Sequence, residues 1–589
     1  MKKISFFALA LAAGLMMGCS DDNSLVEGPS TGSSTTGKGY ISLAINLPTQ
    51  PSARANDNFD DGLEEEYRVE DATLLVFSGT SEDAARFTGA YPLTLNDGTQ
   101  VGGNITTTYQ VTQQITKPLA DGDDIYALVM VNSKKNNVLT GSAEAGWQIL
   151  GNALTVGTTT VADVKGMNGN VTAAALADAS GEGYFYMTNA PLYSVPGGVS
   201  EPANGAVTTL TKINAENIFS TAAEAEDNPA ASIYVERGVA KVTVTDGGTA
   251  GQNGNLNYTI NGWTLDMTNT ASYAVRNVTG ADWWTLYSRL AATRDYRFVG
   301  SVPVAAGLYR TYFGMDPNYN VPGTFNEQIG EVPAALTALT GTAYCLENTF
   351  DVDHQNQDQT TRVIVAATLT GVGGDADGKD FYVVNNDKGN VLNTAGLEAY
   401  VKKQYLENPT VYGLLTDRDN GLKDGDENKL TEADLKVTYS TSTASADVTI
   451  AAVTIADAAA AKFKGDAIPA DLAGSGNADA LATINEAKIA YYKGGVSYYP
   501  VMIQHFGDDQ TPWTAGSESY PAPNRDDNYL GRWGVLRNNW YEINVTGVRS
   551  IGSPVVPEVY GTPDDPVESW ISVEINVLSW AKRVQNADL

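Results

Sequence analysis

The sequence predicts a mainly β protein made of β-sandwiches with a few helices. Short apolar segments with alternating periodicity recur along the chain, and Gly, Asn and Asp turns separate them. The composition agrees, since 58 glycines and 30 tyrosines favour turns and strands over long helices. A chain of 589 residues is too long for one hydrophobic core. We therefore expect two or three domains.

The charge balance excludes several classes of function. The chain has 37 Lys and Arg against 69 Asp and Glu, which gives a formal net charge of −32. Such an acidic surface repels phosphate backbones, so no nucleic-acid partner is expected. Only two histidines are present, which leaves little material for acid/base or metal chemistry. We expect neither an enzyme nor a cofactor.

The first residues are typical of an export signal. Lys2-Lys3 precede an apolar run, Ile4 to Met17, that is short for a membrane span, so residues 1–18 are predicted to be a signal peptide. The run ends before Cys19 in a sequence that resembles a bacterial lipobox. We expect acylation, including palmitate, at Cys19, and attachment of the precursor to the outer membrane. An ordinary signal peptide that happens to contain a cysteine is the alternative.

A flexible tether and a first strand follow the signal. The Gly/Ser/Thr-rich segment 20–38 predicts a tether. The next segment predicts a half-buried strand whose apolar side chains share one face: Ile41, Leu43, Ile45 and Leu47. Arg54 then lies among small residues in a polar segment, where a trypsin-like protease could reach it. Residues 19–54 are interpreted as one tether-and-strand unit.

Further strands and helices are expected in order along the chain. Strands are predicted at 67–77 and 125–131, and one long strand over 232–244. A further strand at 258–267 is expected to pair with this long strand. Helical spacing predicts helices at 394–407 and 477–490, and two aromatic-rich segments, 491–503 and 538–545, are expected to be strands with their rings in the core. The predicted sandwich domains are 55–272 and 273–553.

The chain ends in an isolated amphipathic strand. Four prolines punctuate the acidic segment that follows residue 553, which is typical of an extended spacer. Beyond it, branched apolar residues recur with period two: Ile571, Val573, Ile575 and Val577. Residues 554–589 are therefore interpreted as a spacer and a strand.

The two terminal strands allow two interpretations. Each could simply belong to the sandwich nearest to it. Alternatively, loss of the strand before Arg54 would leave an apolar groove, and the C-terminal strand of a neighbouring molecule could fill it by strand addition. A head-to-tail contact of this kind generates a filament if it does not close.

Several segments resemble the fimbrillins of type V pili of Bacteroides-type bacteria, and in particular the major subunit of the short fimbriae. The resemblance rests on the lipobox at Cys19, Ser52 to Ala55, Val235 to Val242, Val535 to Val545, and the proline-rich stretch that leads into Ile571 to Trp580. It covers both ends and the middle of the chain in the family's order.

The resemblance implies a fold and an assembly route. Such subunits have two transthyretin-like β-sandwich domains, and an Arg-specific protease cuts them. The corresponding cut here would lie between Arg54 and Ala55, and residues 569–580 would be the donor strand. The implied partners are other copies of the chain, accessory tip and anchor subunits, and ligands on host or bacterial surfaces. The implied role is a fimbrial subunit that supports adhesion and biofilm formation.

A second hypothesis is a stand-alone surface adhesin, or a tip or anchor subunit, that keeps its first strand.

Other motifs are given structural interpretations. Cys345 is expected to be a buried apolar residue, and His354 a surface-loop residue. The EF-hand-like segment 424–428 lacks the required Gly and Glu and is interpreted as a solvated turn, although a weak Ca²⁺ site is an alternative. Segments 28–32 and 373–379 match nucleophile-elbow and phosphate-loop spacings by chance.

Overall fold

The computed structural model describes most of the chain outside its leader. These are residues 37–48, 64–95, 99–100, 106–116, 120, 122–177, 183–193, 207–278, 299–305, 308–311, 313–319, 326–350, 354–374, 380–442, 446–506, 531–561, 571–578 and 582–586. Strands predominate among them, which confirms the mainly β prediction.

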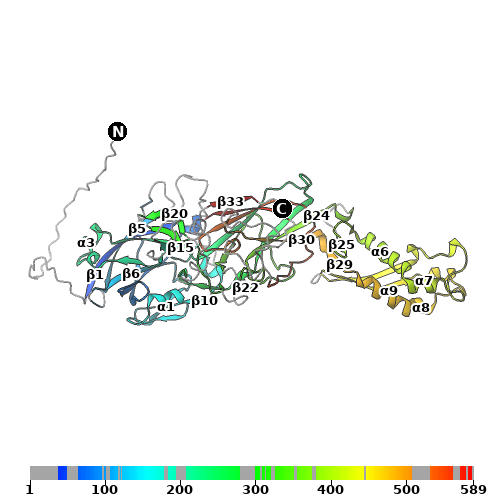
Figure 1. The fold of residues 1–589 in the computed structure, drawn as a ribbon, viewed down its shortest axis with the longest axis horizontal. Helices are drawn as coiled ribbons and strands as arrows, with labels where there is room; N and C mark the ends of the chain where they lie inside the picture. The colour runs from blue at the N-terminus through cyan, green and yellow to red at the C-terminus, as the bar shows by residue number, and fades with distance from the viewer. Residues whose placement is uncertain are drawn as a thin grey trace, which may run out of the picture.

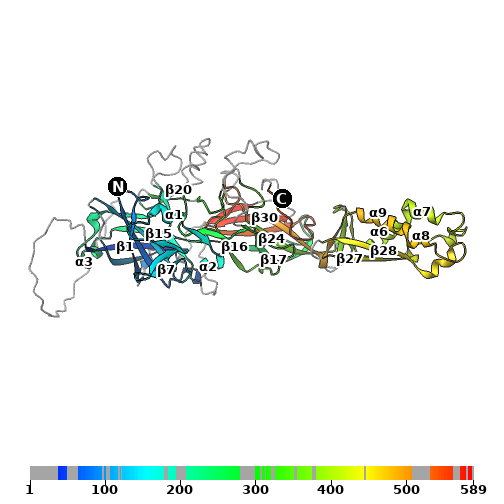
Figure 2. The same cartoon turned by 90° about the horizontal axis from the view of Figure 1, so that it is seen from below.

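The molecule is elongated, and the three largest hydrophobic cores of its described part lie in a row. Figures 1 and 2 show the first sheet at one end, a second sandwich in the middle, and a helical part at the far end. Strand β1 (Lys38–Pro48) lies in the first sheet, whereas α6 (Thr394–Glu407) and α9 (Ser475–Glu486) lie at the opposite end.

Nine of the described strands form the first sheet. Their order is β3-β2-β6-β11-β15-β1-β5-β4, and β14 pairs with β6. The bounds are β2 Ala72–Gly79, β3 Arg86–Leu93, β4 Thr99–Gln100, β5 Thr106–Thr116, β6 Asp124–Val131, β11 Met187–Asn189, β14 Thr211–Ile213 and β15 Ala231–Arg237. The predicted strand at 125–131 is confirmed as β6. The strand predicted at 67–77 begins only at Ala72, because a 3-10 turn, η1 (Glu64–Tyr67), precedes it.

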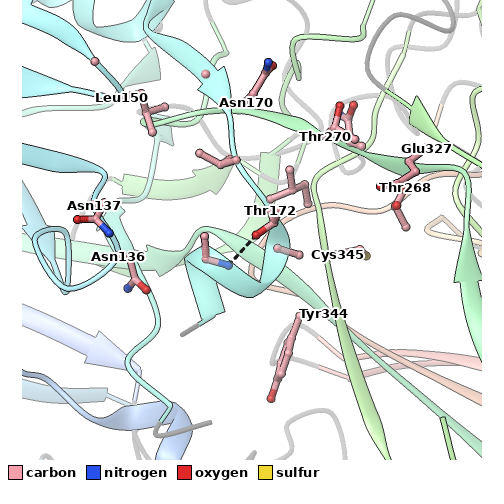
Figure 3. A pocket seen from close by; sticks show the side chains of 17 residues that line it. Asn136, Asn137, Leu150, Asn170, Thr172, Thr268, Thr270, Glu327, Tyr344 and Cys345 are labelled. Carbon is pink, nitrogen blue, oxygen red and sulfur yellow. Dashed lines mark hydrogen bonds between the residues drawn. The ribbon is translucent and has the colours of Figure 1, made fainter. Parts of the chain in front are cut away.

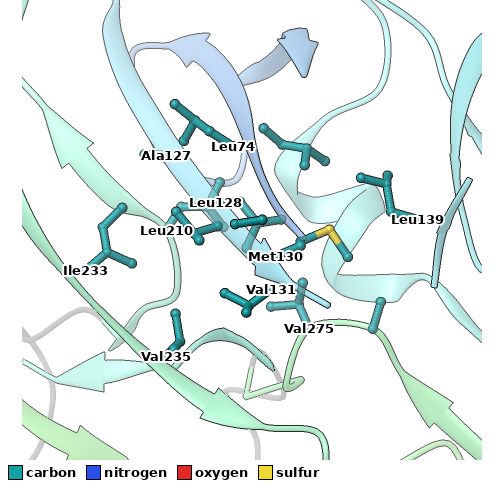
Figure 4. Packing of buried hydrophobic residues seen from close by; sticks show 14 of the residues in the cluster. Leu74, Ala127, Leu128, Met130, Val131, Leu139, Leu210, Ile233, Val235 and Val275 are labelled. Carbon is teal, nitrogen blue, oxygen red and sulfur yellow. The ribbon is translucent and has the colours of Figure 1, made fainter. Parts of the chain in front are cut away.

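The first sheet curls around its own core. The Tyr91 hydroxyl on β3 donates to Thr116 Oγ1 on β5 at 3.1 Å and accepts from the Thr116 amide at 2.9 Å, so strands from opposite parts of the order meet. Every residue of β2 is buried, as is nearly all of β6. Figure 4 shows the side chains of these strands packed against Ile233 and Val235 of β15 and against Val275. The core thus includes residues far apart in the sequence.

Smaller elements cover this core. They are β7 Leu139–Ser142, β8 Gly146–Ile149, β9 Asn152–Leu154, α1 Val161–Gly166, β10 Asn168–Asn170, α2 Ala173–Ala177, β12 Leu192–Tyr193, β13 Val207–Thr208, η2 Ala215–Asn217 and α3 Ala222–Asp227. Helices α1 and α3 each begin with a capping box, formed by Thr160 with Asp163 and by Thr221 with Glu224. Reciprocal capping explains how such short helices hold their first turn.

The chain passes from the first core to the second at Gly238. The long strand predicted over 232–244 is wrong, because the structure has two strands in different sheets: β15 ends at Arg237 and β16 (Val239–Asp246) starts after the glycine. A Cβ at Gly238 would lie 2.9 Å from Cδ1 of Tyr186, so only glycine fits this close crossing. The expected partner of strand 258–267 is also wrong, since β17 (Asn257–Asp266) pairs with β24 (Arg362–Thr370) rather than with the preceding strand.

Two sheets enclose the second core. One has the order β23-β16-β31-β32-β33 and the other β17-β24-β30. The additional bounds are β23 Thr342–Leu346, β30 Val496–Met502, β31 Trp540–Val548, β32 Ile571–Leu578 and β33 Lys582–Asn586. Tyr492, Tyr499 and Tyr541 are buried between the sheets, which confirms the prediction that the aromatic segments contribute core residues. This core already contains Ala240, although the predicted domain boundary lies at 272–273.

The remaining short elements connect the two sandwiches or lie beside them. They are β18 Thr268–Asn269, β19 Ala271–Tyr273, β20 Val299–Ala305, β21 Leu308–Thr311, β22 Asn326–Glu327 and η3 Val372–Gly374. Strand β19 pairs with β10 of the first part, and β21 pairs with β12. The chain therefore returns to the first part after it has entered the second.

The helical part interrupts the second sandwich between β24 and β30. It enters through β25 (Phe381–Val384) and leaves through β29 (Ile489–Tyr492), which pair with each other. The rings of Phe381 and Tyr492 stack at this neck with centroids 4.4 Å apart. Its other elements are β26 Val391–Leu392, α7 Pro409–Leu415, η4 Asp426–Asn428, η5 Glu432–Asp434, β27 Leu435–Thr441, β28 Val448–Ile455, η6 Asp457–Lys462, α8 Ala470–Ala473 and η7 Lys493–Gly495.

The two predicted helices are present in this part. Helix α6 has the predicted bounds, with Asn393 as N-cap and Pro409 beyond its end. Helix α9 ends at Glu486 rather than continuing to residue 490, because the next residues form β29. No helix among those described has the length and apolar composition needed to cross a bilayer.

Cys345 is buried on β23, as predicted, and burial raises the pKa of its thiol to about 12. Because alkylation requires the thiolate and an open path to it, we expect native protein lacking Cys19 to resist iodoacetamide at pH 8. The same protein should react fully in denaturant, and mass spectrometry of the two samples measures the difference. Rapid labelling of the native protein would contradict this burial.

Candidate functional site

Strand β1 lies inside the first sheet, not at its edge. It pairs in parallel with β15, from Leu43 opposite Ala231 to Asn46 opposite Tyr234. On its other side it pairs antiparallel with β5 along its whole length. The sheet therefore holds β1 by backbone hydrogen bonds along both of its edges.

The predicted apolar face of β1 points into the core. Ile41, Leu43 and Ile45 are fully buried, and Leu47 is 2% exposed. Burying one such side chain contributes about 1.5–3 kcal/mol, so the four together contribute about 6–12 kcal/mol. This is comparable with the whole stability of a typical domain, about 5–15 kcal/mol. Loss of β1 would therefore lower the stability of the first domain and leave an apolar groove that another strand could fill.

The opposite face of β1 carries a polar contact that the sequence did not identify. The Asn46 amide nitrogen donates to the Ile233 carbonyl on β15 at 3.2 Å, and its oxygen accepts from Thr108 Oγ1 on β5 at 2.7 Å. Ser42, on the same face, is fully buried, while Ala44 between them is partly exposed. Asn46 thus bridges both neighbouring strands, which favours one register of β1.

The predicted C-terminal strand is β32, and it pairs antiparallel with β31 of its own chain. The register places Ile571 opposite Val548, Val573 opposite Val545, and Val577 opposite Tyr541. Strand β33 pairs with the other side of β32, so the last described part of the chain forms a hairpin. The side chains of β32, including Ile575, lie outside what the structure describes.

Several predicted site residues fall outside the described part of the chain. These are the lipidation site Cys19 and the two residues of the expected cut, Arg54 and Ala55. The described chain stops at Pro48 and resumes at Glu64, so the expected cut lies between β1 and η1 in sequence. The roles of these residues remain predictions.

Just after that interval, Glu66 joins the two sandwiches. Its carboxylate lies 2.7 Å from Lys241 Nζ on β16, and both side chains are buried. The Tyr344 hydroxyl donates to the same carboxylate at 2.7 Å, and the Arg237 guanidinium donates to the Glu66 carbonyl at 3.0 Å. The Lys241 ammonium also lies 3.9 Å from the ring centre of Trp540 on β31.

A second buried ionic cluster lies at the same junction. Arg276 Nε is 2.9 Å from Glu236, and Arg537 Nε is 3.0 Å from Glu347. Burial raises the pKa of Glu236, and the charge of Arg276 opposes this rise. The sequence signal for this junction is the group of charged residues, Glu236, Arg237 and Lys241, inside the apolar run around Gly238. The same pattern also fits one continuous strand, which is the strand predicted over 232–244.

Where the structure describes them, the other candidate motifs do not come together in one site. Residues 424–428 form an exposed turn in which Asp426 pairs with Lys429, as expected for a solvated turn. His354 is partly exposed, and His505 is buried with Nδ1 2.7 Å from the Tyr541 hydroxyl. Within the described ranges, no three His, Cys, Asp or Glu side chains are placed to hold a metal ion.

An open cavity of about 740 Å³ lies beside the junction. Its walls combine Asn136 and Asn170 of the first part with Thr268, Glu327 and Tyr344 of the second. Figure 3 shows these side chains around the hollow. Apolar residues and neutral polar residues line the cavity together, and Glu327 is the one charged residue among the described lining residues, so this lining holds no pair of ionised side chains for acid/base catalysis.

The Glu66–Lys241 pair makes a testable contribution to stability. Replacing Lys241 with Met keeps the length of the side chain but removes the cation that lies 2.7 Å from the buried Glu66 carboxylate, so we expect a loss of about 3–5 kcal/mol in the free energy of unfolding. Lys423→Met is a matched control, because the Lys423–Asp466 pair is exposed and should change stability by at most about 1 kcal/mol. Urea unfolding measures both; equal losses would contradict the importance of the buried pair.

One family model matches a segment near the end of the chain. Residues 490–586 match the family model described as major fimbrial subunit protein type IV, fimbrillin, C-terminal. No curated protein matches the chain.

Solved structures give distant likenesses. A putative cell adhesion protein from Parabacteroides distasonis is 9% identical, with a TM-score of 0.35 over 92% of this chain and 99% of that chain. A fimbrilin from Porphyromonas gingivalis is 13% identical, with a TM-score of 0.32 over 91% and 96% of the two chains. A putative cell adhesion protein from Bacteroides eggerthii is 11% identical, with a TM-score of 0.31 over 93% and 98%.

These TM-scores are low, so the assignment rests on the family model, which covers β29 to β33. Over residues 490–586 the chain is similar to the C-terminal domain of fimbrillins, which confirms the resemblance to the type V fimbrillin family inferred from its sequence.

Proposed function

We propose that this protein is a structural subunit of a cell-surface fimbria that polymerises by strand exchange. The observation that carries the proposal is the position of β1, which pairs with β5 along its whole length and with β15 over Leu43–Asn46, and buries four branched side chains. The fimbrillin match at the other end of the chain supports the fimbrial context. The role is structural and adhesive rather than enzymatic.

The first step is removal of β1. An Arg-specific protease cuts between Arg54 and Ala55, and the segment up to Arg54 leaves with the lipidated leader. Its departure opens a slot between β15 and β5 that is apolar on one side and lined by unpaired backbone groups along both edges. Unpaired buried backbone groups are costly, so the slot strongly favours an incoming strand.

The incoming strand is the C-terminal strand of the next subunit. Ile571, Val573, Ile575 and Val577 repeat the period-two spacing of the β1 face, so they can fill the four positions that it leaves. Among the described strands it pairs with β31 and β33, both outside the first sheet, so it can detach without unfolding that sheet. The proline-rich spacer before this strand can extend, so that the strand can reach the slot of the neighbouring subunit.

The remaining assignments follow from this role. The precursor is an outer-membrane lipoprotein attached through Cys19, and the mature form lies in surface fimbriae with tip and anchor subunits. The chain crosses between the two sandwich domains at Gly238, ahead of the boundary expected at 272–273, and the helical part is inserted in the second domain. The fimbria contacts ligands on host or bacterial surfaces and supports biofilm formation.

A second candidate is a stand-alone adhesin, or a tip or anchor subunit, that keeps β1. The pairing of β1 with both β15 and β5 in the uncut chain favours it, because the first sheet is then already closed around its core. The mature N-terminus separates the two functions. Sequencing of surface material would begin at Ala55 for the polymerising subunit and before Gly39 for the alternative.

Assembly itself can be tested with purified protein. Protein that begins at Ala55 should form ladders of SDS-resistant oligomers on unheated gels, whereas protein that begins at Gly39 should stay monomeric because β1 occupies the slot. Adding a synthetic peptide of residues 39–54 in excess should suppress the ladder by refilling the slot. Persistent monomers of the Ala55 form would reject the proposal.

Deleting residues 569–589 provides the matched control. This variant keeps the slot but lacks the donor strand, so it should remain monomeric while its circular dichroism stays that of a folded β protein. When mixed with the complete Ala55 form, it should accept one donor and terminate chains. A ladder formed by the deletion variant alone would show that another surface drives assembly.

A further inference from the structure

We infer that the C-terminal strand copies β1 residue by residue and enters the slot in the same direction and register, with Asn576 taking the place of Asn46. This inference rests on the proposed strand exchange and specifies how the two subunits fit. It concerns the orientation of the donor strand, which could be wrong even if strand exchange occurs.

The two strands share a sequence. Residues 40–47 read Tyr-Ile-Ser-Leu-Ala-Ile-Asn-Leu, and residues 570–577 read Trp-Ile-Ser-Val-Glu-Ile-Asn-Val. The offset is constant, since 571 − 41 = 530 and 577 − 47 = 530. Two isoleucines, the serine and the asparagine are identical, and aromatic and branched residues replace one another elsewhere. A strand that only needed alternating apolar residues would not have to repeat the polar ones.

The repeated polar residues match specific demands of the slot. Asn46 is bonded to the Ile233 carbonyl on one side and to Thr108 Oγ1 on the other. Losing a partner for such groups costs more than an exposed hydrogen bond contributes. With the offset of 530, the Asn576 amide takes the position of the Asn46 amide and can bond to the Ile233 carbonyl and to Thr108 Oγ1. Ser572 takes the buried position of Ser42.

The one difference in charge falls at the position that tolerates it. Glu574 corresponds to Ala44, which is partly exposed between the two buried polar residues. A carboxylate there can reach solvent, so the match does not require a buried unpaired charge.

Direction matters because the apolar pattern alone does not fix it. If the strand were reversed about Glu574, its four branched residues would still face the core. Ser572 would then lie opposite Thr108, and Asn576 opposite Thr112, because Asn46 pairs with Thr108 and Ser42 with Thr112 in the β1 register. The two directions therefore predict different neighbours for residue 576.

Paired cysteines distinguish the two directions. Thr108 and Thr112 are both partly buried on β5, and they lie on the same face four residues apart, so they occupy equivalent places in the ladder. We would prepare the Ala55 form with Ser572→Cys together with either Thr112→Cys or Thr108→Cys, which keeps Asn576 in place. Residue 572 lies opposite residue 112 in the proposed direction and opposite residue 108 in the reverse direction. Cys345 is buried, and protein that begins at Ala55 lacks Cys19, so the new thiols alone should react.

The expected result is a covalent ladder for the 112/572 pair after oxidation, which survives boiling and disappears on reduction. The 108/572 pair should give no covalent ladder, while the parent protein still forms its SDS-resistant ladder on unheated gels. A covalent ladder from the 108/572 pair, or from neither pair, would overturn the register while leaving strand exchange intact. Absence of any unheated ladder in both variants and in the parent protein would instead reject strand exchange.

The role of Asn576 has its own test. Asn576→Leu should leave the Ile233 carbonyl and Thr108 hydroxyl of the acceptor without partners, and we expect the donor strand to bind about tenfold more weakly or worse. Glu574→Gln is the matched control and should change binding little. Competition by peptides of residues 569–580 carrying each substitution, added to the 569–589 deletion variant, measures both. Equal binding of the Asn576→Leu and parent peptides would overturn the assignment.

Discussion

The rest of this structure depends on the placement of β1 between β15 and β5. A strand at a sheet edge can be lost at the cost of one set of hydrogen bonds, but β1 is paired along both edges and also supplies four side chains to the core. Its burial contributes free energy on the scale of a domain's whole stability. Removing β1 therefore leaves a strand-binding groove between β15 and β5. A strand that resembles β1 in its apolar and polar side chains fits this groove.

The two sandwiches are joined by buried charge rather than by a flexible linker. Glu66 follows the first strand closely in sequence and is held by Lys241, Tyr344 and Arg237 at the junction. Buried ion pairs of this kind add specificity of geometry more than net stability. Here they fix η1 to the second sandwich, so the chain after the expected cut has an anchor of its own, independent of β1. The partner strand of Lys241, β31, is also the strand that holds β32 in the free subunit.

The acidic surface and the apolar strands have separate roles. The net charge of −32 keeps like molecules apart in solution. The face of β1 that packs inward is uncharged, and in the C-terminal strand only Glu574 interrupts a neutral segment. Association of two copies of the chain through such strands would bury little charge. The backbone pairing between the strands would fix their register. The helical part inserted between β24 and β30 is built on its own core at the far end from β1, away from these strands.

The sequence by itself determined the mainly β class, helix α6 with its bounds, the buried state of Cys345, and the inward face of β1, because these follow from local periodicity, capping and composition. Only the tertiary structure decided that the chain changes sheets at Gly238, that β17 pairs with β24, that β1 lies inside its sheet, and that Asn46 bridges two strands. Pairing partners and crossings depend on contacts between residues far apart in the chain, which periodicity does not encode. The similarity between residues 40–47 and 570–577 is present in the sequence. Only the hydrogen bonds of Asn46 to both neighbouring strands explain why the polar residues are repeated.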